Sequence, residues 1–146
     1  MEESELLQQF IGTMMKVRRF IDPAIGIPQE DKTATLLQTQ ALTFLKEHPQ
    51  STVGELAQYL HMSSSAIAQF TDRLTDAHLI ERKNDPNDRR IVRLSLTATG
   101  DDRLISLRKV IQERMGNILT RIPEKDLKEV IRIFGNLLEN LEEENK

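Results

Sequence analysis

Two closely spaced helix starts constrain the fold of this 146-residue chain more than any other feature of its sequence. Thr52-Val53-Gly54-Glu55 is a capping-box pattern, in which a threonine hydroxyl and a glutamate carboxylate satisfy the first free amides of a helix. That helix is expected to end near Leu60, and Ser63 then offers a new N-cap for a helix ending near Ala77. The sequence therefore predicts two short helices over residues 52–77, joined by a turn of about three residues.

After this helical pair the pattern changes to a strand, a turn and a second strand. Residues 79–83 and 91–96 have the character of strands, and the Asn-Asp-Pro-Asn-Asp run at 84–88 favours a turn. Alternation along the second strand places three apolar side chains on one face: Val92, Leu94 and Leu96. Positions 82–93 hold five basic and two acidic residues. We therefore expect a β-hairpin over about 79–97, the wing, with a polar and basic tip.

Amphipathic helices are expected on both sides of this region. Residues 2–21 repeat apolar side chains at intervals of three or four: Leu6, Phe10, Met14, Val17 and Ile21. Asp22-Pro23 is expected to end that helix, because proline disfavours the helical conformation in the residue before it. A loop over 22–32 and a second helix over 33–47 should follow. The remainder, 97–145, is expected to be helical, with Pro123 in the first turn of the last helix.

Together these elements predict a single domain over 1–146 that is mainly α-helical with a small β-hairpin. Its centre is a winged helix-turn-helix over 33–97, with the helix-turn-helix at about 52–77. The flanking helices, within 1–32 and 98–146, carry long apolar stripes. These stripes are better explained as a core shared between two subunits than as the exposed surface of a monomer. The alternative is that the flanking helices pack together within one chain.

The composition argues against several classes of protein. The chain has no cysteine, which excludes disulfides, thiolate metal sites and cysteine nucleophiles. Its three histidines are scattered without the spacing of metal ligands, and it has no glycine-rich phosphate loop or recognisable catalytic arrangement. No apolar run approaches the ~20 residues of a membrane-spanning helix, and the start of the chain does not resemble a secretory signal. We therefore expect a cytoplasmic protein without enzymatic activity, cofactor, metal or membrane contact.

A winged helix-turn-helix suits double-stranded DNA, because a helix fits the major groove and a hairpin can reach the neighbouring backbone or minor groove. Five residues of the second helix of the pair are candidates for DNA contact: Ser63, Ser64, Ser65, Gln69 and Arg73. Glutamine can pair bidentately with adenine. The serines have the alternative role of a capping cluster alone, and Arg73 could instead form an ion pair with Asp72 or Asp76.

The wing supplies the second group of candidates. Arg89 and Arg90 lie at its tip, where arginine can enter a narrow minor groove. Asp88 would repel DNA on its own, so we expect it to orient an arginine through a charge-assisted hydrogen bond. The alternative is an exposed turn with ordinary solvated charges. Because the net charge of the whole chain is −3, DNA affinity would depend on where the basic residues lie.

Residues 84–97 resemble the wing signature of the MarR (multiple antibiotic resistance regulator) family of transcription factors. The family's Asp-x-Arg followed by Leu-Thr is matched by Asp88, Arg90, Leu96 and Thr97. The resemblance extends to Thr52-Val53-Gly54-Glu55-Leu56-Ala57, to Asp72-Arg73-Leu74 and to the order of the helices, so that it covers nearly the whole chain. Three positions depart from the family pattern: Gln69 replaces a frequent arginine, and His61 and His78 replace frequent glycines.

The resemblance implies a homodimer whose first and last helices interlock and whose two winged modules read a palindromic DNA operator. It implies that Arg90 reaches the minor groove with Asp88 as its partner. It also implies a repressor that a small-molecule effector releases from DNA, although the sequence indicates no ligand-binding residue. The alternative function is a winged-helix module that binds proteins and has lost DNA binding, which the low basic content of the second helix favours.

Overall fold

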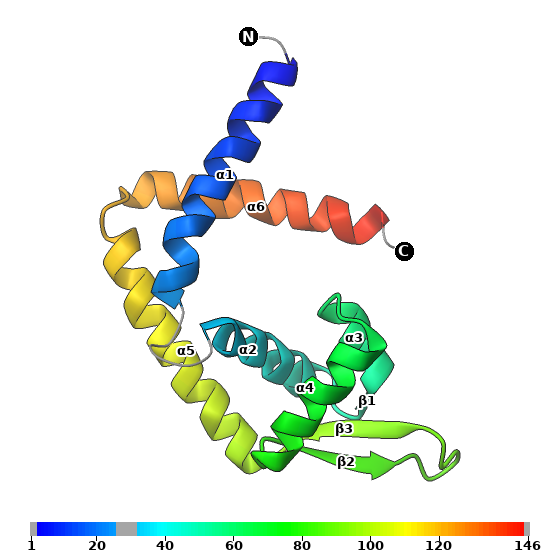
Figure 1. Cartoon of the computed structure of the whole chain (residues 1–146). Helices are drawn as coiled ribbons and strands as arrows, with labels where there is room; N and C mark the ends of the chain where they lie inside the picture. The colour runs from blue at the N-terminus through cyan, green and yellow to red at the C-terminus, as the bar shows by residue number, and fades with distance from the viewer. Residues whose placement is uncertain (1–2, 26–31, 145–146) are drawn as a thin grey trace. The chain divides into compact units, whose positions relative to one another are not determined.

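The computed structural model describes the backbone of residues 3–25 and 32–144, and the surroundings of the side chains of residues 3–21 and 36–144 (Figure 1). In chain order the elements are α1 (Glu3–Ile25), α2 (Lys32–Glu47), β1 (Ser51–Thr52), α3 (Val53–Tyr59), α4 (Ser64–Asp76), β2 (Ile80–Asn84), β3 (Val92–Leu96), α5 (Ala98–Leu119) and α6 (Glu124–Glu144). The chain divides into two compact units, 1–111 and 112–146, and the division falls within α5. The mainly α-helical winged fold predicted from the sequence is confirmed.

The helix-turn-helix forms through the two N-caps that the sequence predicts. The backbone N–H of Thr52 donates to Glu55 Oε2 at 2.8 Å, and the backbone N–H of Glu55 donates to Thr52 Oγ1 at 3.1 Å, which completes the capping box of α3. Ser63 Oγ accepts the backbone N–H of Ala66 at 3.2 Å and caps α4. These capping bonds fix where both helices begin, and therefore fix the short turn between them.

Both helices of the pair end in the same way, on a histidine in the left-handed region. The φ angle is 52° at His61 and 59° at His78. After α3, the N–H of Met62 bonds to the carbonyl of Ala57 at 2.9 Å, and after α4 the N–H of Leu79 bonds to the carbonyl of Leu74 at 2.9 Å. These bonds define Schellman motifs, whose left-handed residue is most often glycine in proteins generally, because glycine has no Cβ atom.

The wing is an antiparallel hairpin of β2 and β3, with β1 added on the other edge of β3, in the order β1-β3-β2. Arg82 pairs with Leu94 in the hairpin, and Thr52 of β1 pairs with Arg93. In Figure 1 the loop between β2 and β3 lies at the end of the hairpin away from α5. Sequence reasoning missed β1, because a strand of two residues is too short to show an alternating pattern.

The core joins the wing to the helices. Leu94 is fully buried on β3, and its neighbours on the same face, Val92 and Leu96, pack against the core, as the alternation predicts. The other fully buried large side chains come from α2 to α5 and β2: Leu42, Leu45, Leu56, Ile67, Leu74, Ile80, Leu104 and Leu107. Because α4 contributes to this core along one side, its rotation about its own axis is fixed.

The prediction for the end of the first helix is wrong. Helix α1 continues through Asp22 and Pro23 to Ile25, so residues 22–25 are not loop. Pro23 lies in the last turn, where the one backbone hydrogen bond that proline removes leaves the preceding turns intact. The rest of the expected loop, including Gly26 and Pro28, lies outside the described residues. Helix α2 begins at Lys32, one residue before the predicted start.

The C-terminal helix α6 begins directly after Pro123, whose carbonyl accepts the N–H of Leu127 at 3.0 Å. No described residue of α6 is buried, although the helix is strongly amphipathic. Its exposed large apolar side chains are Val130, Ile131, Ile133, Phe134, Leu137, Leu138 and Leu141. Within the described ranges, no helix combines the length and apolar character that a membrane crossing requires.

Candidate nucleic-acid interface

Helix α4 has one buried side and one exposed side. Its buried residues are Ile67, Phe70, Thr71 and Leu74, which follow the helical repeat. The exposed side carries four of the residues that the sequence suggests for DNA contact: Ser64, Ser65, Gln69 and Arg73. The structure therefore brings these four onto the solvent-facing side of one rigid helix, which is the arrangement that reading of base edges requires.

The three serines differ in what their hydroxyls do. Ser63 is the N-cap of α4, and its Oγ lies 3.3 Å from Ser65 Oγ. The capping role suggested for the cluster therefore belongs to Ser63. Ser64 and Ser65 lie in the first turn of the helix and are exposed, so both are accessible from solvent at the N-terminal end of α4.

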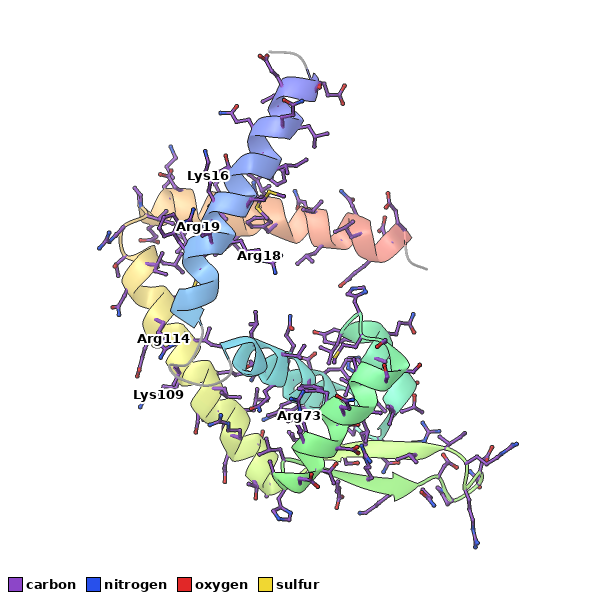
Figure 2. The ribbon with its side chains drawn as sticks, in the orientation of Figure 1. Lys16, Arg18, Arg19, Arg73, Lys109 and Arg114 are labelled. Carbon is purple, nitrogen blue, oxygen red and sulfur yellow. The ribbon has the colours of Figure 1, made fainter. Side chains whose placement is uncertain are left out.

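Arg73 is exposed, and Figure 2 shows it on α4. Asp72, one of its two suggested ion-pair partners, is bound to a different residue, with Asp72 Oδ1 2.7 Å from Arg82 NH2. Neither Asp72 nor Asp76 forms an ion pair with Arg73 in the described part of the chain. Its guanidinium is therefore available to an external anion.

Arg82 of β2 connects the wing to α4, and sequence reasoning counted it only as one of the basic residues of the hairpin. Arg82 NH2 donates to Thr71 Oγ1 at 2.6 Å as well as pairing with Asp72. Thr71 is fully buried, and its Oγ1 lies 2.9 Å from the carbonyl oxygen of Ile67 in the same helix. The contact fixes the wing against the middle of α4. No local pattern could reveal it, because the partners are eleven positions apart and belong to different elements.

At the wing tip Asp88 holds Arg90 at two points. Arg90 Nε donates to Asp88 Oδ1 at 3.1 Å, and Arg90 NH2 donates to Asp88 Oδ2 at 3.0 Å. The backbone N–H of Arg90 also donates to Asp88 Oδ1 at 3.0 Å. These hydrogen bonds, chiefly those from the side chain of Arg90, lower the pKa of Asp88 below the ordinary 3.8. The side chain of Arg90 nevertheless remains 90% exposed, so it is oriented and still accessible.

A second carboxylate, Asp85, organises the loop below the tip. Its Oδ1 accepts the backbone N–H groups of Asn87 at 2.8 Å and of Asp88 at 3.2 Å, and its Oδ2 accepts Arg93 Nε at 2.9 Å. The hydrogen bond from Asn87, followed by that from Arg93, lowers the pKa of Asp85 below 3.8. Sequence reasoning placed Asp85 only in a turn. The sequence feature that could have revealed its role is an aspartate at the start of a turn, whose carboxylate can accept the backbone N–H two residues later in an Asx-turn.

Two further residues complete the exposed surface. Arg89 is exposed beside Arg90 at the tip. Ala68 is exposed on α4, one turn after Ser64 and Ser65, and sequence reasoning missed it. Its spacing of three and four residues from Ser65 and Ser64 could have placed it on the exposed side of the helix. Alanine at such a position can contact a thymine methyl group.

The surface has no features of a metal centre. In the described ranges, no three His, Cys, Asp or Glu side chains gather as a metal ion would require.

Basic side chains also lie outside the helix-turn-helix and the wing, on α1 (Lys16, Arg18 and Arg19) and on α5 (Lys109 and Arg114), as Figure 2 shows. The wing differs from these helices because Arg89 and Arg90 stand on a loop that backbone and side-chain hydrogen bonds fix.

Comparison with known proteins identifies relatives of this chain. The model of the MarR family matches residues 34–92. The chain is 31% identical over 129 residues to the HTH-type transcriptional repressor MdtR of Bacillus subtilis, covering 86% of this chain and 81% of that protein. It is 35% identical over 109 residues to the uncharacterized HTH-type transcriptional regulator YsmB of the same organism, covering 75% of this chain and 72% of that protein.

Solved structures share the fold. The transcriptional regulator BldR from Sulfolobus solfataricus superposes with a TM-score of 0.76 at 22% identity, over 96% of this chain and 99% of that one. A crystal structure of MarR superposes with a TM-score of 0.72 at 23% identity, over 92% of this chain and 96% of that one. With the winged helix-turn-helix and the sequence relatives, these observations lead to one conclusion: the chain belongs to the MarR family and is a DNA-binding transcriptional regulator.

Proposed function

We propose that this regulator binds a palindromic DNA operator as a homodimer, with α4 of each subunit in a major groove and each wing at the adjacent minor groove. In this proposal residues 33–97 form the DNA-binding region, and residues 1–32 and 98–146 form the dimerisation region. The observation that carries it is the state of Arg90, which Asp88 holds at two points while its side chain stays 90% exposed.

An arginine held in this way suits the minor groove. A narrow groove concentrates negative potential, and arginine binding there gains most when its orientation is already fixed. Asp88 lowers the net charge of the tip but removes rotamers that Arg90 would otherwise lose on binding. Arg89, exposed beside it, supplies a second positive charge for the backbone phosphates.

The exposed side of α4 supplies groups of several kinds for base edges. Gln69 can pair with adenine, Ala68 can contact a thymine methyl group, and Ser64 and Ser65 can donate to or accept from bases and phosphates. Arg73 can reach a phosphate or a guanine, since the described residues leave its guanidinium available. This mixture favours selective contacts at a few base pairs over general attraction to DNA.

Dimerisation would cover the apolar side chains of α6 and α1. Phe134 is 40% exposed and Leu137 is 43% exposed on α6, while Leu6 and Phe10 are each 51% exposed on α1. An exposed apolar face on each of two long helices is typical of an interface between subunits. A two-fold relation between the subunits would match a palindromic operator, whose half-sites lie about one DNA turn, ~34 Å, apart.

We further propose that the regulator represses transcription and that a small molecule releases it from DNA. The relative MdtR is named a transcriptional repressor, which supports the direction of control. Operator affinity would fall if the effector bound preferentially to a second arrangement of the dimer. In that arrangement the spacing of the two α4 helices would differ from the spacing of the half-sites. The required difference in spacing is small, because base contacts tolerate little displacement.

The test is operator binding measured by gel shift, on a duplex that the wild-type protein selects from a random-sequence pool. We expect Arg90→Ala to lose most of the affinity. Arg121→Ala, which removes the same charge from an exposed position before α6, should bind like the wild type. Wild-type affinity should fall steeply with salt. Unchanged binding by Arg90→Ala would reject the role of the wing, and a selection without an enriched palindrome would reject the operator proposal.

A further inference from the structure

Four charged residues of the wing form a connected series. Arg93 on β3 bonds to Asp85, Asp85 bonds to the backbone N–H of Asp88, and Asp88 holds the guanidinium of Arg90. Each link is a hydrogen bond of 3.2 Å or less. The conformation of the exposed arginine therefore depends on a carboxylate five positions earlier in the chain.

We propose that Asp85 is a positioning residue for DNA binding: its carboxylate sets the loop that presents Arg90, so that an acidic residue on a DNA-binding wing strengthens the binding of DNA. The inference rests on the proposed contact of Arg90 with DNA and extends it to a residue that would not itself touch the nucleic acid. Asp85 is well placed for this, since its side chain is only 13% exposed.

Both oxygens of the carboxylate are used. Oδ1 accepts two successive backbone N–H groups, from Asn87 and Asp88, which fixes the backbone just before Arg90. Oδ2 accepts Arg93 Nε. The positive guanidinium of Arg93 and the two N–H dipoles offset the charge of Asp85, so the repulsion that it exerts on DNA phosphates is small compared with the order that it imposes.

The other end of the series is anchored on the helix-turn-helix. Arg93 NH1 donates to the carbonyl of Gln50 at 3.3 Å, and Arg93 pairs through its backbone with Thr52, the N-cap of α3. Gln50 is itself held in the left-handed region, with φ 63°. The loop that carries Arg90 is thus connected to the residues just before α3, as well as to β3.

The sign of the effect separates this proposal from simple electrostatics. If Asp85 acted only as a negative charge near DNA, its removal would tighten binding. If Asp85 positions Arg90, its removal weakens binding even though the net charge becomes more favourable. We expect Asp85→Ala to weaken binding to the selected duplex about tenfold, the size of effect associated with losing hydrogen bonds to a charged group. Asp102→Ala, the same change at an exposed position on α5, should bind as well as the wild type or better.

A double-mutant cycle tests whether Asp85 acts through Arg90. Asp85→Ala should cost about tenfold in the wild-type background and little in the Arg90→Ala background. Hydroxyl-radical footprints should lose protection in the minor groove next to each half-site and keep the protection under α4. Additive losses, or loss of protection over the whole site, would show a general structural effect and overturn the proposal.

The results also separate this inference from the proposed function. If Arg90→Ala weakens binding and Asp85→Ala does not, the proposed function stands and the role of Asp85 is wrong. If Arg90→Ala binds like the wild type, the proposed function of the wing fails, and Asp85 cannot act through it. Should Asp85→Ala fail to fold, Asp85→Asn retains an acceptor for the two amides but opposes Arg93 with an amide group. It should show a smaller loss with the same dependence on Arg90, and an additive loss would overturn the proposal.

Discussion

The two histidines in the left-handed region each place a side chain where the backbone favours glycine. At such a position, a residue with a Cβ atom costs roughly 1–2 kcal/mol relative to the right-handed conformation. Glycine loses more backbone entropy on folding, which offsets roughly 0.5–1 kcal/mol of that cost. Since His78 also closes the Schellman motif of α4, its conformation is fixed by hydrogen bonds and cannot relax.

We therefore expect His78→Gly to raise the free energy of unfolding by roughly 0.5–1 kcal/mol. Urea denaturation followed by circular dichroism measures the change. His48→Gly is the control, because His48 does not have a positive φ and the same replacement there should destabilise the protein. A lower stability of His78→Gly would mean that the imidazole makes a contribution larger than the backbone strain.

The carboxylates of the wing give a pH dependence with a definite sign. The pKa values of Asp85 and Asp88 both lie below the ordinary 3.8, because hydrogen bonds from Asn87 and Arg90 respectively favour the charged forms. A carboxylate whose pKa is lower in the folded state stabilises that state at pH values above its pKa in the unfolded chain. This contribution is lost as the pH falls through the lowered pKa values.

We expect the free energy of unfolding of the wild type to decrease more steeply with acidification below pH 3.8 than that of an Asp85→Ala/Asp88→Ala variant. Urea denaturation over a pH series, from neutral to strongly acidic, measures both slopes. Parallel profiles for the two proteins would show that the wing carboxylates have no linkage to folding.

At the scale of elements, substitutions on α4 should separate two kinds of DNA contact. Gln69→Ala should reduce discrimination at an adenine position by about 1–3 kcal/mol, because the bidentate pair is lost. Arg73→Ala, if Arg73 binds a phosphate, should weaken binding to all sequences and reduce the salt slope by about 1 per subunit. Binding of single-base operator variants at several salt concentrations measures both effects. The assignment of Gln69 fails if its variant keeps the wild-type order of preference among bases.

Elements defined by neighbours in the sequence were predictable, whereas contacts between elements were not. Both N-caps, the turn between α3 and α4, and the alternation of β3 follow from local patterns, and the structure has them where they were expected. The contact of Arg82 with Thr71 depends on how β2 packs against α4, which no local pattern specifies. The end predicted for α1 was too early. The tendency of Pro23 to end a helix was outweighed by the helical turns that precede it.

At the scale of the whole molecule, the apolar face of α6 gives a test of assembly. Phe134→Glu should shift the protein from dimer to monomer, because an unpaired carboxylate in an apolar interface is strongly unfavourable. Light scattering coupled to size-exclusion chromatography measures the mass. Asn136→Glu adds the same charge to an exposed polar position two residues away, and should leave the dimer intact. A Phe134→Glu protein that remains dimeric would place the interface elsewhere.

Thr52 belongs to two elements at once, as the last residue of β1 and the N-cap of α3. Its pairing with Arg93 and its capping hydroxyl are lost together when this residue moves. Local opening of the wing would therefore also fray the start of α3. The protected backbone amides of the two elements should then exchange with solvent hydrogen at the same rate. We therefore expect the hairpin and the helix-turn-helix to open as one cooperative unit.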